Sequence, residues 1–312
     1  MMKTLYTNAH ILSPGVDLPN ASVLEEEGVV VQVYPPSMAL PSFDEAIDCD
    51  GHLLLPGFFD IHARPARGKD MAKSLKQMKK AGVMNILAAE EDGDYDAIAQ
   101  QCKETAAAMD KADGAAAHVF GIHLAGPYKS TDFLEVKALQ KICAIRKVTF
   151  DVELPGAMDF AQKLRKEGIV PCCGGTCSDY DVLAEALQNG VRDIGGFEAA
   201  GLPAVLAGLG EDGFSLEFAA DKAAENAPLI RFMFKTKGLD RLMMTVSAAD
   251  VPFTEGLKAL VAVTGLPLKD LIRTTSLNQA VSLGIHDIGR IEPGYKAEFV
   301  LLDDELNVVK TF

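Results

Sequence analysis

The chain has 312 residues and a formal charge of −14, which disfavours nucleic acid and anionic membrane surfaces as partners. Hydrophobic residues make up 48% and charged residues 24%, as in folded globular proteins rather than disordered ones. The six cysteines are sparse for this length, so we expect reduced thiols. The N-terminus shows no apolar signal segment and no window approaches ~18 consecutive apolar residues, so we expect a cytoplasmic protein without a membrane span.

Residues 1–55 predict a small β unit. Clusters of Gly and Pro around Pro14, Pro35 and Pro41 divide this stretch into short apolar runs. The expected strands are residues 4–8, 21–25, 29–34, 46–50 and 52–55.

From residue 56 the pattern changes to alternating strands and helices. The expected strands are residues 58–62, 83–88, 119–124, 147–152, 169–173, 193–196, 214–219 and 241–246. The expected helices are residues 70–81, 94–111, 132–145, 157–167, 178–189, 199–208 and 225–237. Repeated units of this length imply parallel strands, and eight strands favour an α/β fold of the (β/α)8 TIM-like barrel type. An open doubly wound sheet is the alternative.

The end of the chain predicts a return to the first unit. Helices are expected at residues 253–263, 268–273 and 276–283, and the tail from residue 289 to 311 alternates like strands. We therefore expect a small β-sandwich domain built from residues 1–55 and 285–312, with the barrel domain of residues 56–284 inserted between them.

Three polar residues alternate along the first expected barrel strand. Asp60, His62 and Arg64 are two residues apart, so their side chains should point the same way. Polar groups at the tip of a buried strand are costly to desolvate unless something binds them. The alternation therefore marks a candidate site.

Four stretches of the sequence carry a family resemblance. They are Leu-Leu-Pro-Gly-Phe-Phe-Asp-Ile-His at 54–62, Gly-Ile-His-Leu-Ala-Gly-Pro-Tyr at 121–128, Lys-Val-Thr-Phe-Asp-Val-Glu at 147–153, and the run from 265 to 294. Together they resemble the amidohydrolase superfamily and, within it, the N-acetylglucosamine-6-phosphate deacetylases. The resemblance covers nearly the whole chain and implies the barrel fold, a role in carbohydrate metabolism and, as commonly in the family, a homodimer.

The resemblance also implies a metal-activated water that hydrolyses an acetamide, held by a Glu and two His, with an Asp as acid/base. Glu153 matches the family Glu, and His62 matches the first His of the first-strand pair. Most other positions are replaced. Where the two ligand histidines are expected, the chain has Gly-Gly-Thr at 174–176 and Gly-Gly-Phe-Glu-Ala-Ala at 195–200, and Val246 stands in place of the Asp. Lys-Ala-Ala at 222–224 replaces the substrate His, Arg64 replaces the second His of the first strand, and Ala125 replaces the Glu beside His123.

These replacements predict a degenerate metal site at Glu153 and His62, with His123 and Arg64 as substrate-binding residues. We expect no resident cofactor, and a divalent metal such as zinc is the alternative. Glu153 could instead pair with Arg64 in a fork that needs no metal. His62 and His123 could be ligands, proton shuttles or hydrogen-bonded strand-end histidines.

The cysteines offer one further alternative. Cys172, Cys173 and Cys177 could form a soft-metal site with Glu153, although Cys172 and Cys173 should point to opposite faces of one strand. The competing interpretation is that all three are small buried hydrophobes.

Three functions remain open from the sequence, and whether the chain is an enzyme is among the open points. The first is an amidohydrolase-fold relative of the deacetylases with a lost or remodelled metal centre and weak or no deacetylase activity. The second is an active hydrolase on a different amide or sugar, using Asp60, His62, His123, Glu153 and Cys177. The third is a non-catalytic protein that binds a small molecule such as an amino-sugar phosphate, or has a regulatory role.

Overall fold

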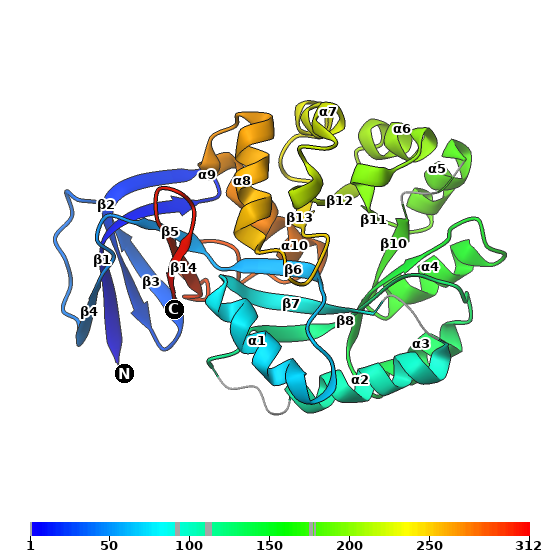
Figure 1. Ribbon diagram of the computed structural model, residues 1–312, viewed down its shortest axis with the longest axis horizontal. Helices are drawn as coiled ribbons and strands as arrows, with labels where there is room; N and C mark the ends of the chain where they lie inside the picture. The colour runs from blue at the N-terminus through cyan, green and yellow to red at the C-terminus, as the bar shows by residue number, and fades with distance from the viewer. Residues whose placement is uncertain (1, 91–93, 110–113, 175–176, 178) are drawn as a thin grey trace.

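Two sheets organise the computed structural model, which describes residues 2–90, 94–109, 114–174, 177 and 179–312. A seven-stranded sheet built from both ends of the chain stands beside an eight-stranded parallel sheet that is surrounded by helices (Figure 1). The predicted TIM-like barrel with a small β domain from both termini is thereby confirmed. No helix among the described residues is long and apolar enough to cross a membrane.

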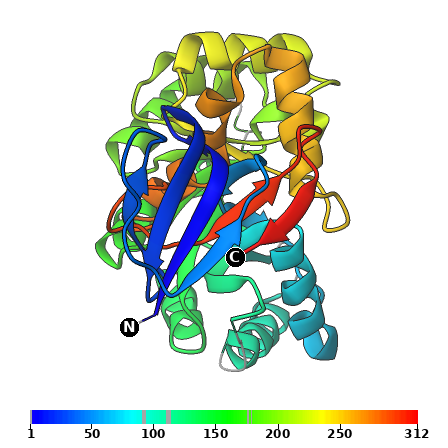
Figure 2. The same ribbon diagram turned by 90° about the vertical axis from the view of Figure 1, so that its left-hand side faces the viewer.

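The small sheet joins the two termini. Its strands are β1 (Lys3–Ser13), β2 (Val16–Glu26), β3 (Val29–Tyr34), β4 (Glu45–Asp48), β5 (Leu53–Pro56), β14 (Phe299–Leu302) and β15 (Val308–Thr311). Strand β14 pairs antiparallel with β5, so backbone hydrogen bonds tie the tail to the first segment (Figure 2). Tyr6 also packs edge-on against Phe299 and Phe312, with ring centroids 5.2 and 4.9 Å away.

The first hairpin is longer than the sequence predicts. Strands β1 and β2 run on to the tight turn at Pro14 and Gly15, so the expected strands at 4–8 and 21–25 were too short. Bulges around Ala9 interrupt the alternation of apolar residues, so the pattern predicts a strand that ends before Ala9. The exact domain boundaries, after residues 55 and 284, stay a prediction.

The barrel strands follow one another in sequence order. They are β6 (Phe58–Ala63), β7 (Val83–Glu90), β8 (His118–Tyr128), β9 (Ile145–Phe150), β10 (Val170–Gly174), β11 (Asp193–Gly195), β12 (Ser215–Ala219) and β13 (Leu242–Thr245). Each pairs in parallel with the next, without the reversal of order that a doubly wound sheet requires. That alternative was therefore wrong.

Helices follow most strands and cover the outside of the barrel (Figure 1). They are α1 (Met71–Lys80), α2 (Tyr95–Met109), α3 (Phe133–Gln140), α4 (Ala157–Lys166), α5 (Tyr180–Gln188), α6 (Leu202–Gly210), α7 (Ala227–Lys237), α8 (Phe253–Thr264), α9 (Leu268–Leu271) and α10 (Leu277–Ser282). The expected helix at 132–145 was too long, because Ile145 already begins β9. The expected ends at residues 110, 111 and 178 lie outside the described residues.

Side chains, rather than ladder hydrogen bonds, complete the barrel between its first and last strands. β6 and β13 lie side by side, but the described residues show no ladder pairing between them. The carbonyls of β13 that face β6 find other donors. Asn278 Nδ2 donates to the Leu242 carbonyl (2.7 Å) and Gln279 Nε2 to the Met244 carbonyl (3.0 Å). Helix α10 therefore serves as the partner of the β13 edge, satisfying buried carbonyls that would otherwise be costly.

The Pro56-Gly57 step carries the chain from the small sheet into the barrel. The Gly57 N–H donates to the Glu298 carbonyl at 2.8 Å. A Cβ at Gly57 would lie 2.1 Å from Met84 Cγ, so only glycine fits this junction without displacing β7.

The side-chain closure of the barrel can be tested at Asn278. Its amide donates to two backbone carbonyls, those of Leu239 and Leu242. We expect Asn278→Ala to lower the free energy of unfolding by about 2–4 kcal/mol, because it leaves both carbonyls without a donor. Urea denaturation would measure the loss. The matched control is Asn189→Ala, whose exposed amide also donates to a carbonyl and can be replaced by water. Equal losses in the two variants would contradict the proposed role of Asn278.

Candidate functional site at the barrel mouth

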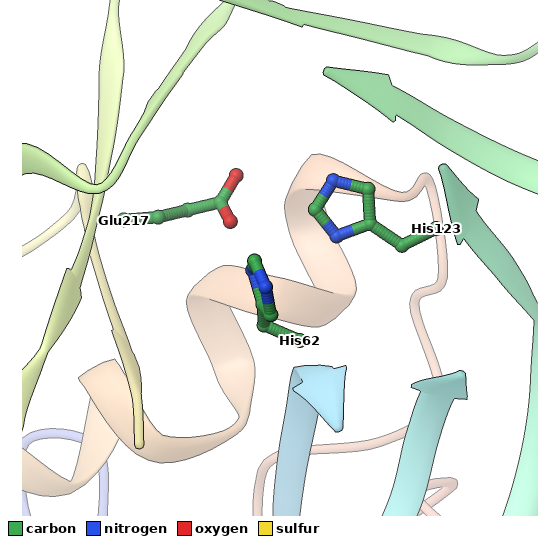
Figure 3. A group of neighbouring side chains, drawn as sticks. All are labelled: His62, His123 and Glu217. Carbon is green, nitrogen blue, oxygen red and sulfur yellow. The ribbon is translucent and has the colours of Figure 1, made fainter. Parts of the chain in front are cut away.

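Three potential metal-binding side chains converge inside the carboxyl end of the barrel. His62 comes from β6, His123 from β8 and Glu217 from β12, and one ligand atom of each lies within 4.8 Å of the others (Figure 3). Parallel strands bring their carboxyl ends to the same face, so residues far apart in sequence meet there. This is the one group of its kind among the described residues.

His123 is held as a neutral, fully hydrogen-bonded imidazole. Its Nδ1 lies 2.9 Å from the Ile61 carbonyl, which can only accept, so Nδ1 carries the proton. Its Nε2, 2.8 Å from Thr149 Oγ1, is left as the acceptor of the hydroxyl. Burial, and then the neighbouring His62 and Lys147, hold the pKa of His123 well below its ordinary value. Both ring nitrogens of this predicted substrate-binding residue thus have protein partners.

Arg64 spans the gap between the first and last strands at the mouth. Its Nη1 donates to the carbonyls of Val246 (3.4 Å) and Ser247 (3.1 Å), and its Nη2 lies 3.1 Å from His62 Nε2. Because a guanidinium only donates, His62 Nε2 must present its lone pair to Arg64. Val246 is the position where the family resemblance led us to expect an acidic residue, and the guanidinium lies beside its backbone instead.

A buried ammonium occupies the barrel interior below the histidines. The Lys147 ammonium lies between the carboxylates of Asp193 and Glu217, and all three side chains are almost completely buried. Burial alone would lower the pKa of Lys147, but the two carboxylates outweigh it and raise the pKa above its ordinary value. The lysine is therefore charged. Cys172 Sγ completes the cluster, 3.5 Å from Glu217 Oε1.

Asp60 lies on the wall of the same region. Its Oδ1 accepts the His62 N–H at 2.9 Å, and burial raises the pKa of its carboxyl to about 6, even though His62 and Arg64 act to lower it. Asp60, His62 and Arg64 line one cavity of about 180 Å3, which extends to Met78 and Phe253 between α1 and α8. The three alternating residues of the first barrel strand thus come together, as their spacing predicted.

The donor types of the His62, His123 and Glu217 group suit zinc. Their surroundings do not fit a resident divalent ion. His62 Nε2 faces a guanidinium, His123 Nε2 accepts from Thr149, and Glu217 is paired with the Lys147 ammonium. A divalent ion would have to displace these donors beside two fixed cations. The residues present therefore disagree with a family-type metal centre, and we derive no catalytic step through one.

The other predicted site residues lie elsewhere. Glu153 is exposed in the turn after β9 and does not belong to the three-residue group. Cys173 Sγ contacts the Asp193 carbonyl (3.6 Å) and Cys177 Sγ the Asp179 carbonyl (3.5 Å), with burial raising the pKa of both thiols. The turn residues 175 and 176 lie outside the described part of the chain. The metal role of Glu153 and His62 stays a prediction.

Sequence reasoning missed the charged cluster. Lys147 and Glu217 lie in the middle of the short strands β9 and β12, next to buried apolar residues, and Asp193 is the first residue of β11. A charge in such a strand is a usable signal, because the interior of a barrel is normally filled with apolar side chains. What could not be read from the sequence was that the three charges meet.

The buried cluster makes Lys147 a strong determinant of stability. We expect Lys147→Met to reduce the free energy of unfolding by roughly 3–5 kcal/mol, because two buried carboxylates lose their counter-charge. Urea denaturation would measure it. Lys137→Met is the control, since the Lys137–Glu167 pair is exposed and 3.9 Å long, and should change stability by less than about 1 kcal/mol. A loss in Lys147→Met no larger than in the control would refute the counter-ion role.

The raised pKa of Asp60 predicts a pH-dependent stability. A carboxyl whose pKa is higher in the folded state adds most to the free energy of unfolding below its unfolded pKa, near 4. That contribution is lost as the pH rises through the folded pKa of about 6. Asp60→Asn cannot ionise but keeps an acceptor for the His62 N–H. We expect the free energy of unfolding of this variant, relative to that of the wild type, to rise by about 3 kcal/mol between about pH 4 and pH 7. Denaturation at each pH would measure it. A stability difference that does not vary with pH would exclude the assignment.

Comparisons with known proteins agree with the fold and with the resemblance read from the sequence. The chain is 21% identical to the N-acetylglucosamine-6-phosphate deacetylase of Lysinibacillus sphaericus over 336 aligned residues, covering 86% of each protein. It is 24% identical to the human deacetylase over 350 aligned residues, covering 86% of this chain and 84% of the relative.

Solved structures give the same result. A variant of the Mycobacterium smegmatis deacetylase in complex with N-acetyl-D-glucosamine-6-phosphate superimposes with a TM-score of 0.84 at 19% identity, covering 100% of this chain and 98% of that chain. The Pasteurella multocida enzyme gives the same score, identity and coverage. Identities this low show the fold alone. The model of the Amidohydrolase family matches residues 59–312, and the chain therefore belongs to the amidohydrolase family.

Proposed function

We propose that this amidohydrolase-family protein binds a small polar ligand at the barrel mouth and has weak or no metal-dependent deacetylase activity. One observation carries the proposal: two protein cations, Arg64 and Lys147, engage the groups that would otherwise bind a metal. A cytoplasmic location and a homodimer belong to the same proposal.

The electrostatic argument rests on the low polarity of the site. Inside a barrel, charges interact far more strongly than in water. The Lys147 ammonium, shared with Asp193, already pairs with Glu217 Oε1, and the Arg64 guanidinium is fixed by two carbonyls beside His62. A further divalent charge would gain less from Glu217 and would be repelled by both cations. Activation of a water molecule on a metal is therefore disfavoured.

The space at the mouth suits a polyhydroxylated ligand. A cavity of about 150 Å3 is bordered by Arg64, Glu198, Glu217, Thr245 and Ser247, among others. Carboxylates accept from hydroxyl donors, and so can the oxygens of Thr245 and Ser247, whose own protons are donated to the Phe218 carbonyl and to Asp221. Since one related structure contains N-acetyl-D-glucosamine-6-phosphate, an amino-sugar phosphate is the first ligand to try.

The proposal makes a direct prediction about metal and turnover. Protein purified without chelator and dialysed against excess zinc should bind well under one equivalent, as measured by elemental analysis. The same sample should not release acetate from N-acetylglucosamine 6-phosphate, whereas that ligand should raise the melting temperature in proportion to its occupancy. About one tightly bound zinc per chain together with turnover would overturn the proposal. If the melting temperature does not change, binding of this ligand is excluded and a structural role is left.

A second candidate function is hydrolysis of a different amide or sugar. The observation in its favour is Asp60, whose pKa of about 6 suits a general acid or base near neutral pH, in a cavity that it shares with His62. The buried, raised-pKa thiol of Cys177 is a poor nucleophile by comparison. Screening of amide and glycoside substrates would support this function if the rate depends on a group titrating near pH 6 and disappears in Asp60→Asn.

A further inference from the structure

A further cavity lies at the opposite end of the barrel from the mouth. It has a volume of about 280 Å3 and is formed where β10 and β11 begin and where α4 and α10 end. Its border includes Arg165, Pro171, Arg192, Ser282 and Gly284. None of these residues belongs to the site described above.

The cavity is cationic in a strongly acidic protein. Two arginines border it, and none of the described residues that line it is acidic, although the chain carries a net charge of −14. Burial, then Arg165 and Arg241, lower the pKa of Arg192, so three like charges influence one another. The nearby carboxylate of Asp193 is directed to Lys147 and to Ser282 Oγ (2.9 Å) in the barrel interior.

Both arginines are held in place by packing or hydrogen bonds. Arg192 Nη1 donates to the carbonyls of Leu187 (2.6 Å) and Val191 (3.0 Å), where α5 ends. The stem of Arg165 packs on Gly190, since a Cβ there would lie 2.4 Å from Arg165 Cδ. No described carboxylate forms an ion pair with Arg165. Hydrogen bonds thus hold Arg192 in place, packing holds the stem of the exposed Arg165, and the described lining of the cavity contains no carboxylate.

We propose that this basal cavity binds a small phosphate-bearing anion, at a site separate from the barrel mouth. Planar guanidinium groups bind phosphate oxygens through paired, charge-assisted hydrogen bonds. The competing interpretation is that Arg192 only caps the end of α5. That role accounts for Arg192, and a positive charge at the exposed Arg165 also suits the last turn of α4. The proposal therefore rests on the cavity that the two arginines border together, whose described lining contains no carboxylate.

Calorimetric titration of the full chain with inorganic phosphate, at constant ionic strength, tests the proposal. We expect saturable binding that Arg165→Gln weakens about tenfold or more, because a charge-assisted contact is lost. Lys166→Gln is the matched control, because it removes the same charge one residue further along α4, at an exposed residue that does not line the cavity. It should change the affinity for phosphate less than about twofold. A parallel titration with glucose 6-phosphate distinguishes free phosphate from a phosphate ester as the preferred ligand.

A third variant locates the binding. Arg64→Gln removes donors at the mouth and weakens the closure of the barrel there, but it leaves the lining of the basal cavity unchanged. In the folded variant phosphate affinity should therefore survive, while it falls in Arg165→Gln. Because general salting-out by phosphate acts equally on all variants, a difference between them reports the site itself. No saturable binding, equal weakening in Lys166→Gln and Arg165→Gln, or loss in Arg64→Gln alone would each overturn the basal site. None of these outcomes depends on whether the mouth binds metal.

Discussion

The Arg64 guanidinium is the interaction on which both the closure of the barrel and the state of its mouth depend. Among the described residues no ladder joins β13 to β6, and side chains supply donors to the carbonyls of Leu242 and Met244 in β13 and of Val246 just after it. Arg64 provides the last of these donors while also contacting His62 Nε2. A buried carbonyl without a donor is costly, so this structural demand fixes a positive charge at the mouth. The closure of the barrel and the charge beside His62 therefore share one residue.

The interior charges follow a related logic. A metal centre supplies concentrated positive charge to ligands from several strands, and here the Lys147 ammonium supplies it to Asp193 and Glu217. A covalently attached cation needs no uptake from solution, but it has one charge and offers no open coordination position. The described barrel thus has a charged interior in which a lysine is the counter-ion of two carboxylates. The chain superimposes on a deacetylase with a TM-score of 0.84 at 19% identity, so this arrangement of interior charges is compatible with the barrel fold that the two proteins share.

The two ends of the barrel have different electrostatics. The mouth combines Arg64 with the carboxylates of Glu198 and Glu217, whereas the opposite end gathers Arg165 and Arg192 without a carboxylate in the described lining. In a (β/α)8 barrel the functional loops normally lie at the carboxyl ends of the strands, while the other end serves stability. A cationic cavity at the stability face is therefore a feature of this chain rather than a requirement of the fold.

Patterns in the sequence were enough to predict the architecture, and the resemblance led us to expect replaced site positions. Strand-helix alternation and the Pro-Gly junction before Asp60 predicted the barrel and its insertion between the two parts of the small β domain, because periodicity and turn chemistry are local properties. The longer β1–β2 hairpin was missed, because its bulges disturb the alternation. Only the tertiary structure decided that Lys147 meets Asp193 and Glu217, 46 and 70 residues further along the chain, and that Glu153 lies in an exposed turn. Which inward charges become partners depends on strand register and stagger around the closed barrel, and no local pattern encodes that geometry.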